Sequence, residues 1–178
     1  MTMEPRDRMT RGTVTLAPIS REERELLGNL LELYIHDLSA IFVDVRLGAD
    51  GRFGYPELAS YVSGASDKFP FLIRYDGAVA GFVLARRGSP VADDPNVLDV
   101  AEYFVLRRFR GHGVGRVAAT LLWEHLRGAW TIRAPVVNPE AVAFWRSVVG
   151  TYTGHVASES ERRSGSKAWI VFSFDNTR

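Results

Sequence analysis

The sequence contains no cysteine, no long hydrophobic run and no excess of charge of either sign. Without cysteine, a disulfide framework, a thiolate zinc site and a covalent cysteine nucleophile are all excluded. No apolar stretch approaches the roughly 18 residues of a membrane span, so we expect a soluble protein without membrane contact. Lysine and arginine number 22 against 21 acidic residues, a formal net charge of +1. No global field attracts nucleic acid, and we expect a cytoplasmic protein with no nucleic-acid partner.

The N-terminal segment, residues 1–12, is polar and rich in arginine. It has no apolar stretch of the kind that a signal peptide needs, and we expect a frayed tail there. With 178 residues and 46% hydrophobic content, the chain suits one domain with its own core. That domain is predicted over residues 13–178, without internal repeats.

Alternating apolar residues and turn signals predict strands along the whole chain. In chain order they are expected at residues 13–19, 69–75, 79–86, 97–106, 130–136, 152–158 and 168–174. Asp76-Gly77 is a strong signal for a hairpin between the second and third of these strands. The charged, serine-rich residues 159–167 are expected to form an exposed loop between the last two.

Helices are predicted between these strands. Ser20 and Glu23 have the spacing of a capping box, and leucines at helical period follow them. A short second helix is expected after Pro56, which suits a first-turn position. A third helix follows Gly113, and a fourth begins at Asn138, where an oxygen cap precedes a proline.

A glycine-rich turn lies where the predicted strand 97–106 runs into a helix, and it reads Arg110-Gly111-His112-Gly113-Val114-Gly115. Alternate glycines let the backbone approach a ligand closely, and the amides at the helix start all point one way. With the helix dipole and the neighbouring Arg107, Arg108 and Arg116, the turn favours a pyrophosphate. A dinucleotide fingerprint needs glycine where Arg116 stands, and no P-loop motif occurs.

The spacing Arg-x-x-Gly-x-Gly, here Arg110, Gly113 and Gly115, resembles the pyrophosphate motif of the GNAT superfamily of N-acetyltransferases. The resemblance extends over residues 14–174 in the order of elements, and Asn138 to Trp145 resembles the second cofactor segment. It implies an α/β (α+β) fold in a single domain. The expected sheet is mixed and mostly antiparallel, with about seven strands flanked by about four helices. The implied cofactor is acetyl-CoA.

The resemblance also assigns residues to the coenzyme A site. They are Phe104, Val105, Arg110, Gly111, His112, Gly113, Val114, Gly115, Arg116, Asn138, Phe144 and Trp145. In such enzymes the pantetheine arm pairs with the strand edge before the turn. Many members carry a tyrosine that protonates the leaving thiolate at the position of Trp145, and an indole cannot act as that acid. The proton donor stays open among Tyr103, Tyr152 and water.

Two acids in the predicted strand 97–106 are candidates for the catalytic base. Glu102 lies in an otherwise apolar stretch, where burial would raise its pKa toward the working pH. Its alternative role is a structural ion pair with a nearby arginine, and Asp99 is the second candidate. Strand alternation places Asp99 and Glu102 on opposite faces unless a bulge intervenes, so only one would face the substrate.

The first helices of the superfamily usually wall the acceptor site, which implies Tyr34, Asp37 and Tyr55 as substrate-binding residues. Acids in this region suit a cationic amine. Tyr34 lies on the apolar stripe of its helix, so a core position is the alternative. No two histidines have metal-ligand spacing, and no metal is predicted.

These features predict an acetyl-CoA-dependent N-acetyltransferase. The expected reaction is direct attack of a primary amine, that of a small molecule, on the thioester in a ternary complex. Two alternatives stay open: a non-catalytic module that binds acetyl-CoA, which Trp145 would favour, and a transferase for a protein amine. The sequence does not decide whether two chains form a homodimer.

Overall fold

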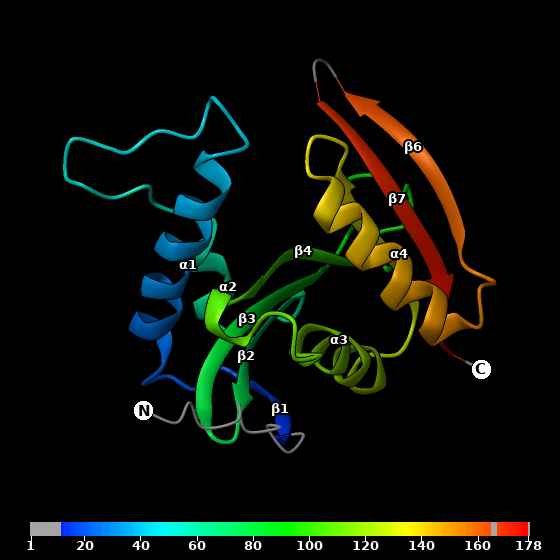
Figure 1. The fold of residues 1–178 in the computed structure, drawn as a ribbon, viewed down its shortest axis with the longest axis horizontal. Coiled ribbons are helices and arrows are strands. Elements are labelled where there is room, and N and C mark those ends of the chain that lie inside the picture. The colour runs from blue at the N-terminus through cyan, green and yellow to red at the C-terminus, as the bar shows by residue number, and fades with distance from the viewer. Residues whose placement is uncertain (1–11, 165–166, 178) are drawn as a thin grey trace, which may run out of the picture.

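A computed structural model describes residues 12–164 and 167–177, so the predicted tail lies outside the described residues except for Gly12. The chain folds into a single domain around one sheet of seven strands in the order β1-β2-β3-β4-β5-β7-β6 (Figure 1). Neighbouring strands are antiparallel except β4 and β5, which are parallel.

The elements are β1 (Val14–Pro18), α1 (Arg24–Ser39), α2 (Leu58–Val62), β2 (Lys68–Tyr75), β3 (Ala78–Arg87), β4 (Leu98–Val105), the 3₁₀ helix η1 (Arg107–Phe109), α3 (Val114–His125), β5 (Ala129–Pro135), α4 (Pro139–Thr153), β6 (Ser158–Ser164) and β7 (Lys167–Asp175). The predicted fold class is confirmed.

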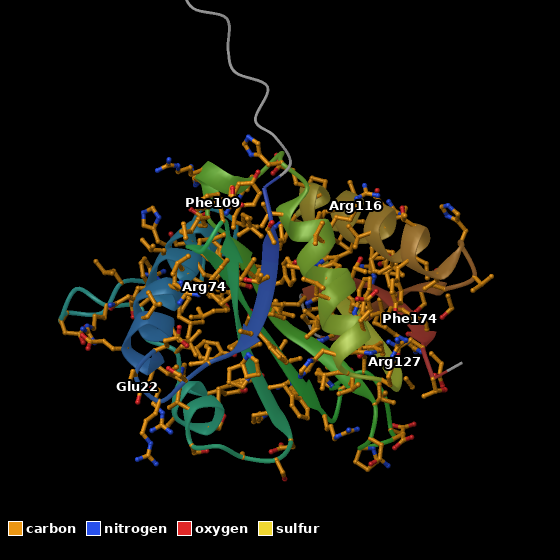
Figure 2. All side chains as sticks on the ribbon, turned by 90° about the horizontal axis from the view of Figure 1, so that it is seen from below. Glu22, Arg74, Phe109, Arg116, Arg127 and Phe174 are labelled. Carbon is orange, nitrogen blue, oxygen red and sulfur yellow. The ribbon has the colours of Figure 1, made fainter. Side chains whose placement is uncertain are left out.

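The helices cover both faces of the sheet. Helices α1 and α2 pack on one face, where Leu27 joins Phe82 in an apolar cluster, and α3 and α4 cover the other. Figure 2 shows α3 beside β1, with Phe109 and Arg116 near the start of this helix and Arg127 at its far end. Each fully buried leucine or phenylalanine contributes about 1.5–3 kcal/mol to the stability of the fold. Each face of the sheet has its own cluster of such residues, so the two clusters stabilise the two faces separately. None of the helices in the described ranges has the length and apolar character of a membrane span.

Local signals set two turns as the sequence predicts. Asp76 and Gly77 have φ values of 48° and 79°, and positive φ at both central residues is the requirement of a type I′ hairpin. The Asn138 side chain accepts a hydrogen bond from the Ala141 amide at 3.1 Å, with Pro139 as the first residue of α4. The connections β2–β3 and β5–α4 therefore follow from neighbouring residues alone.

The C-terminal part differs from the sequence prediction. The predicted strand over residues 152–158 is wrong, because α4 continues as far as Thr153. The predicted loop over residues 159–167 is also wrong, because β6 occupies Ser158–Ser164. Only the final strand, β7, lies where the sequence places it.

Tertiary contacts explain both differences. The ring of Tyr152 packs against Trp123 and Phe174, which favours continuation of the helix over a strand. Strand β6 is an edge strand that pairs only with β7. Its side chains are mostly exposed, so no buried face imposes an apolar alternation that a sequence pattern could reveal.

Candidate active site

The glycine-rich turn forms the beginning of α3. Gly111 and Gly113 each have a φ of 78°, in the left-handed region that disfavours any side chain. Gly113 is the N-cap of α3, and within residues 12–164 and 167–177 no side chain caps this helix. The amides of its first turn therefore remain available to an anion, with the positive end of the helix dipole behind them.

Gly115 brings α3 close to α4. A Cβ atom on Gly115 would lie 3.1 Å from two ring atoms of Phe144 and 3.6 Å from a methyl group of Val105. The Tyr103 hydroxyl also donates a hydrogen bond to the Gly115 carbonyl at 2.5 Å. Any side chain here would displace the Phe144 ring. Glycine thus allows the two predicted cofactor segments, the turn and α4, to meet.

Asp37 on α1 holds the arginines of the turn. One carboxylate oxygen accepts from Arg107 and the other from Arg110, each at 2.8 Å, while the Arg110 Nε–H donates to the Val105 carbonyl at 2.7 Å. Burial opposes ionisation of Asp37, but the hydrogen bonds from the two arginines outweigh it and lower its pKa. The prediction that Asp37 binds the acceptor amine is not supported, because both its oxygens already have cationic partners.

Strands β4 and β5 separate before β4 ends. They pair only where Leu98–Val100 faces Trp130–Ile132, so no strand of the described part of the chain lies against the β4 edge from Ala101 to Val105 on that side. This open edge borders a cleft of about 830 Å³. The strand edge before the turn, with which the pantetheine arm pairs in the enzymes that the sequence resembles, is therefore open here.

The cleft gathers most of the residues predicted for acetyl-CoA. They are Phe104, Val105, Arg110, Gly111, Gly113, Val114, Gly115, Arg116, Asn138, Phe144 and Trp145. His112 does not line the cleft. Its side chain is exposed, because the turn presents backbone rather than this side chain to the ligand space. Arg116 lines the cleft while donating to Ser147 and Thr151 of α4, each at 3.2 Å.

A second cavity of about 360 Å³ adjoins the cleft. The two spaces share the lining residues Tyr34, Leu38, Tyr103, Asn138, Ala141 and Trp145. Tyr55 and Glu102 line the second cavity, together with Phe42 and Trp169 from segments far apart in the sequence. Beside them, Lys167 Nζ lies 3.1 Å from an Asp44 oxygen and links the start of β7 to the chain after α1. A donor in the cleft and an acceptor in this cavity would therefore be neighbours.

Glu102 lies between two tyrosines in the second cavity. Tyr34 donates to one carboxylate oxygen at 2.6 Å and Tyr55 to the other at 3.2 Å. Burial raises the pKa of Glu102 above its ordinary value, although the tyrosines and the charge of Arg133 oppose this rise. Burial also raises the pKa of both tyrosines, which remain hydrogen-bond donors. A carboxylate of raised pKa is a stronger proton acceptor than an ordinary one.

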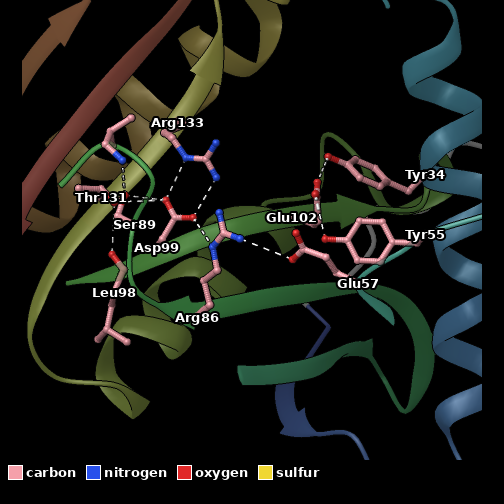
Figure 3. A network of polar contacts seen from close by, with 11 residues as sticks. Tyr34, Tyr55, Glu57, Arg86, Ser89, Leu98, Asp99, Glu102, Thr131 and Arg133 are labelled. Carbon is pink, nitrogen blue, oxygen red and sulfur yellow. Dashed lines mark hydrogen bonds and ion pairs between the residues drawn. The ribbon is translucent and has the colours of Figure 1, made fainter. Parts of the chain in front are cut away.

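A β-bulge in β4 decides which way the acids face. Leu84 pairs with Glu102 and the next residue of β3, Ala85, pairs with Val100, which leaves Ala101 as an extra residue. A bulge reverses the alternation of the strand. Asp99 and Glu102 consequently lie on the same face of the sheet, that of α1 and α2, as Figure 3 shows. The prediction that they face opposite sides applies to an unbulged strand and is wrong here.

Asp99 is enclosed by hydrogen-bond donors and is fully buried. Arg133 donates through Nε and Nη2 at 3.0 and 2.9 Å, and Arg86 donates through Nε at 3.1 Å (Figure 3). Ser89 and Thr131 donate to the same carboxylate at 3.3 and 3.2 Å. Asp99, with both carboxylate oxygens bonded to these partners, lines neither cavity. The structure does not support Asp99 as the base.

The family follows from a comparison of sequences. Residues 32–150 match the sequence model of the acetyltransferase (GNAT) family, and this span covers well over half of the chain. The chain belongs to the GNAT acetyltransferase family. This membership confirms the recognition made from the glycine-rich turn, and acetyl-CoA as the cosubstrate. No curated protein matches the chain significantly.

Solved structures share the fold of this acetyltransferase at low sequence identity. An acetyltransferase from Thermus thermophilus has 17% identity and a TM-score of 0.65, over 92% of this chain and 97% of that one. The aminoglycoside acetyltransferase AAC(6')-Ib with coenzyme A and kanamycin has 13% identity and a TM-score of 0.63, over 92% and 95%. RimL, a ribosomal alpha-N-protein acetyltransferase with coenzyme A, has 14% identity and a TM-score of 0.62, over 92% and 94%.

The sequence leaves three donors open for the leaving thiolate of this acetyltransferase. Tyr152 packs among aromatic side chains and lines neither cavity. Tyr103 lines both cavities, but its hydroxyl donates to the Gly115 carbonyl and burial raises its pKa. Trp145 is 5% exposed and packs on Tyr103 and Phe144, so its core and site-lining roles coincide.

Part of the second cavity could not be predicted from the sequence. Arg86 and Arg133 line it, as do Phe42 and Trp169. The arginines leave a faint signal, since each is a charged residue within or at the end of an apolar strand. Phe42 and Trp169 have no such signal in the sequence, because their approach to the cavity depends on how the chain after α1 folds toward β7.

Proposed function

We propose that this protein transfers the acetyl group of acetyl-CoA to a primary amine of a small molecule, with Glu102 as the general base. One observation carries the proposal. The buried Glu102 carboxylate, held by two tyrosines, lines an acceptor-sized cavity that joins the cofactor cleft through Tyr34 and Trp145. A volume of about 360 Å³ suits a small molecule rather than an extended peptide.

The residues of the cleft fit acetyl-CoA. The uncapped start of α3 and the arginines of the turn provide amide and guanidinium donors for a pyrophosphate. The open edge of β4 offers backbone groups to a pantetheine amide. Bound there, acetyl-CoA supplies an activated thioester carbonyl.

The protein's own side chains then bind the amine and accept its proton. An ammonium that enters the second cavity is attracted by the Glu102 carboxylate and loses a proton to it. Tyr34 and Tyr55 keep the two carboxylate oxygens in place through their hydroxyl groups. The neutral amine is a nucleophile, and the proton on Glu102 can return to solvent.

An assay with a panel of amines tests the proposal. The panel holds small diamines, amino sugars and amino acids, and peptides with free N-termini or lysine. Each is mixed with acetyl-CoA and the protein, and free thiol is measured. We expect thiol release that depends on a small amine and exceeds hydrolysis of acetyl-CoA alone.

Two results would overturn the proposal. Turnover of peptides without turnover of small amines would assign the protein to the class of the protein-directed relatives, of which RimL is an example by its name. Tight binding of acetyl-CoA without transfer to any amine would identify a non-catalytic module. Aminoglycosides belong in the panel because AAC(6')-Ib, a neighbour in fold, carries kanamycin in its structure.

A further inference from the structure

Two arginines line the acceptor cavity on the side of the β4–β5 separation. Arg86 comes from β3 and Arg133 from β5, and each side chain keeps 18% of its surface exposed. Their shared partner is Asp99, which has no exposed surface. The exposed parts of the two guanidinium groups therefore face the cavity while their inner parts hold Asp99 (Figure 3).

The arginines have N–H groups to spare. Arg133 uses Nε and Nη2 on Asp99, and its Nη1 has no hydrogen-bond partner among residues 12–164 and 167–177. Arg86 uses Nε on Asp99, and its Nη1 lies 3.5 Å from a Glu57 oxygen, beyond a strong hydrogen bond. A guanidinium group carries five N–H donors in a planar fork. Several of them are thus left for a ligand of the cavity.

The charges around this wall become net positive once an ammonium binds. The Asp99 and Glu102 carboxylates offset the two guanidinium charges, and the Glu57 side chain is 51% exposed, so water screens its charge. An ammonium at Glu102 neutralises that carboxylate and leaves one guanidinium charge for an anion. Burial opposes the charge on Arg133, but the hydrogen bonds and charge of Asp99 outweigh it and raise its pKa. A positive charge that is partly desolvated attracts an anion more strongly than one in open water.

Glu102 lies on the same face of the sheet, on the neighbouring strand β4, and its charge interacts with those of Arg133 and Arg86. The cavity thus has a carboxylate held by tyrosines and a guanidinium pair held by a buried carboxylate. An amine suits the first and an anion suits the second. A planar carboxylate matches the arginine fork better than a lone point charge does.

We infer that the acceptor is an amine that also carries a carboxylate, with the amine at Glu102 and the carboxylate at Arg133 and Arg86. This inference rests on the proposed function and names its substrate class. Zwitterions such as ω-amino acids have both groups at the two ends of a short chain. Amines without an anionic group would leave the guanidinium fork unmatched.

Matched substrates test the inference. Straight-chain ω-amino acids of increasing length are compared with the carboxamide and the plain alkylamine of the same length. We expect kcat/KM for the carboxylate to exceed that of the carboxamide by about tenfold or more at the best length, as expected when a buried donor is left unpaired. Equal or better turnover of the carboxamide series would overturn the inference.

Protein variants locate the effect. Arg133→Gln alone leaves Asp99 short of donors, so the main variant is the double substitution Arg133→Gln/Asp99→Asn, which removes both charges. Its carboxylate-to-carboxamide ratio of kcat/KM should fall clearly below the wild-type ratio without reaching one, because Arg86 keeps its charge at the site. If the double variant does not fold, the same ratio is measured in Arg86→Gln, because Arg86 has a single contact with Asp99. A variant that folds and keeps the full ratio contradicts the inference.

Arg146→Gln is the matched control. Arg146 also binds a carboxylate through Nε and Nη2, that of Glu159, but it lines neither cavity. This control should keep the wild-type ratio. A fall of the same size in Arg146→Gln would show that loss of any such pair alters the ratio, and it would remove the support for a carboxylate site.

A binding measurement separates this inference from the proposed function. Calorimetry with coenzyme A present follows the binding of ω-acetamido acids and of their amides. If no amine is acetylated but the acids bind and Arg86→Gln weakens them, the proposed function fails and the anion site stands. If amines are acetylated without a carboxylate preference, only the anion site fails. If the ω-acetamido acids do not bind and turnover shows no preference for a carboxylate, the anion site is ruled out.

Discussion

The proposed cofactor cleft and the proposed acceptor cavity are built in different ways. The cleft is formed largely by backbone: two left-handed glycines, the start of α3 and the open edge of β4. The cavity is formed by residues from α1 and the chain after it, the chain before α2, the strands β3, β4, β5 and β7, and α4, which are distant in sequence. The cleft thus presents fixed amide donors, whereas the cavity presents charges whose behaviour depends on their neighbours.

The same contrast separates two acids on β4. Asp99 and Glu102 lie on one face because of the bulge at Ala101. Asp99 has five donors around it and Glu102 has two tyrosines. Guanidinium groups bind both carboxylate oxygens of Asp99, while burial raises the pKa of Glu102 above its ordinary value. One acid holds the structure together, and the other can exchange a proton.

Glu102→Gln should have the largest effect on activity. Loss of a general base lowers kcat by about 10²- to 10⁴-fold, while the cofactor cleft, to which Glu102 does not contribute, should bind acetyl-CoA as before. Thiol release measured with an accepted amine, together with acetyl-CoA binding by calorimetry, checks both parts. Glu124→Gln, an exposed position on α3, is the control. Wild-type kcat in Glu102→Gln would eliminate Glu102 as the base.

Asp99→Asn should have the largest effect on stability. Removing the charge of a fully buried acid leaves Arg86 and Arg133 without their shared partner, which costs about 3–5 kcal/mol. Urea unfolding followed by circular dichroism gives the free energy of unfolding. Glu159→Gln removes an equally bidentate but exposed pair with Arg146 and should cost far less. Similar losses in the two variants would contradict the distinction between Asp99 and a surface acid.

Gly113→Ala should weaken acetyl-CoA binding by about tenfold, which corresponds to roughly 1.4 kcal/mol. No atom blocks a Cβ at Gly113, but its φ of 78° strains any side chain, so the turn and its amides must shift. Calorimetric titration with acetyl-CoA measures the change. Gly64→Ala has the same type of strain at a φ of 84° outside both cavities, and it should leave the affinity unchanged. Equal losses in both variants would point to general destabilisation.

The pH dependence of stability should show the smallest effect. Because the pKa of Glu102 is raised in the folded protein, the folded state binds more protons than the unfolded chain above the ordinary value of 4.5. Its contribution to stability therefore falls as pH rises from that value through the folded pKa. Relative to wild type, Glu102→Gln should gain stability across this window in urea unfolding at several pH values. A difference that is constant with pH would contradict a raised pKa.

Much of the fold could be predicted because its signals are local. Apolar patterns and turn signals predicted the strands up to β5, Asp76-Gly77 predicted a hairpin, and Asn138 predicted the start of α4. The end of α4 and the edge strand β6 could not be predicted. Tyr152 stays helical through its contacts with Trp123, and β6 has no buried face to leave a pattern.

By itself, the sequence determined the family and predicted where the cofactor binds. The glycine-rich turn offers its backbone geometry and a helix start to an anion, and both are encoded by adjacent residues. Only the tertiary structure decided what the charged side chains do. In the folded protein Asp99 and Glu102 lie on one face of the sheet, Asp37 pairs with the arginines of the turn, and Arg133 lines the second cavity. The physical reason is that the charge, pKa and partners of a side chain depend on which distant segments surround it.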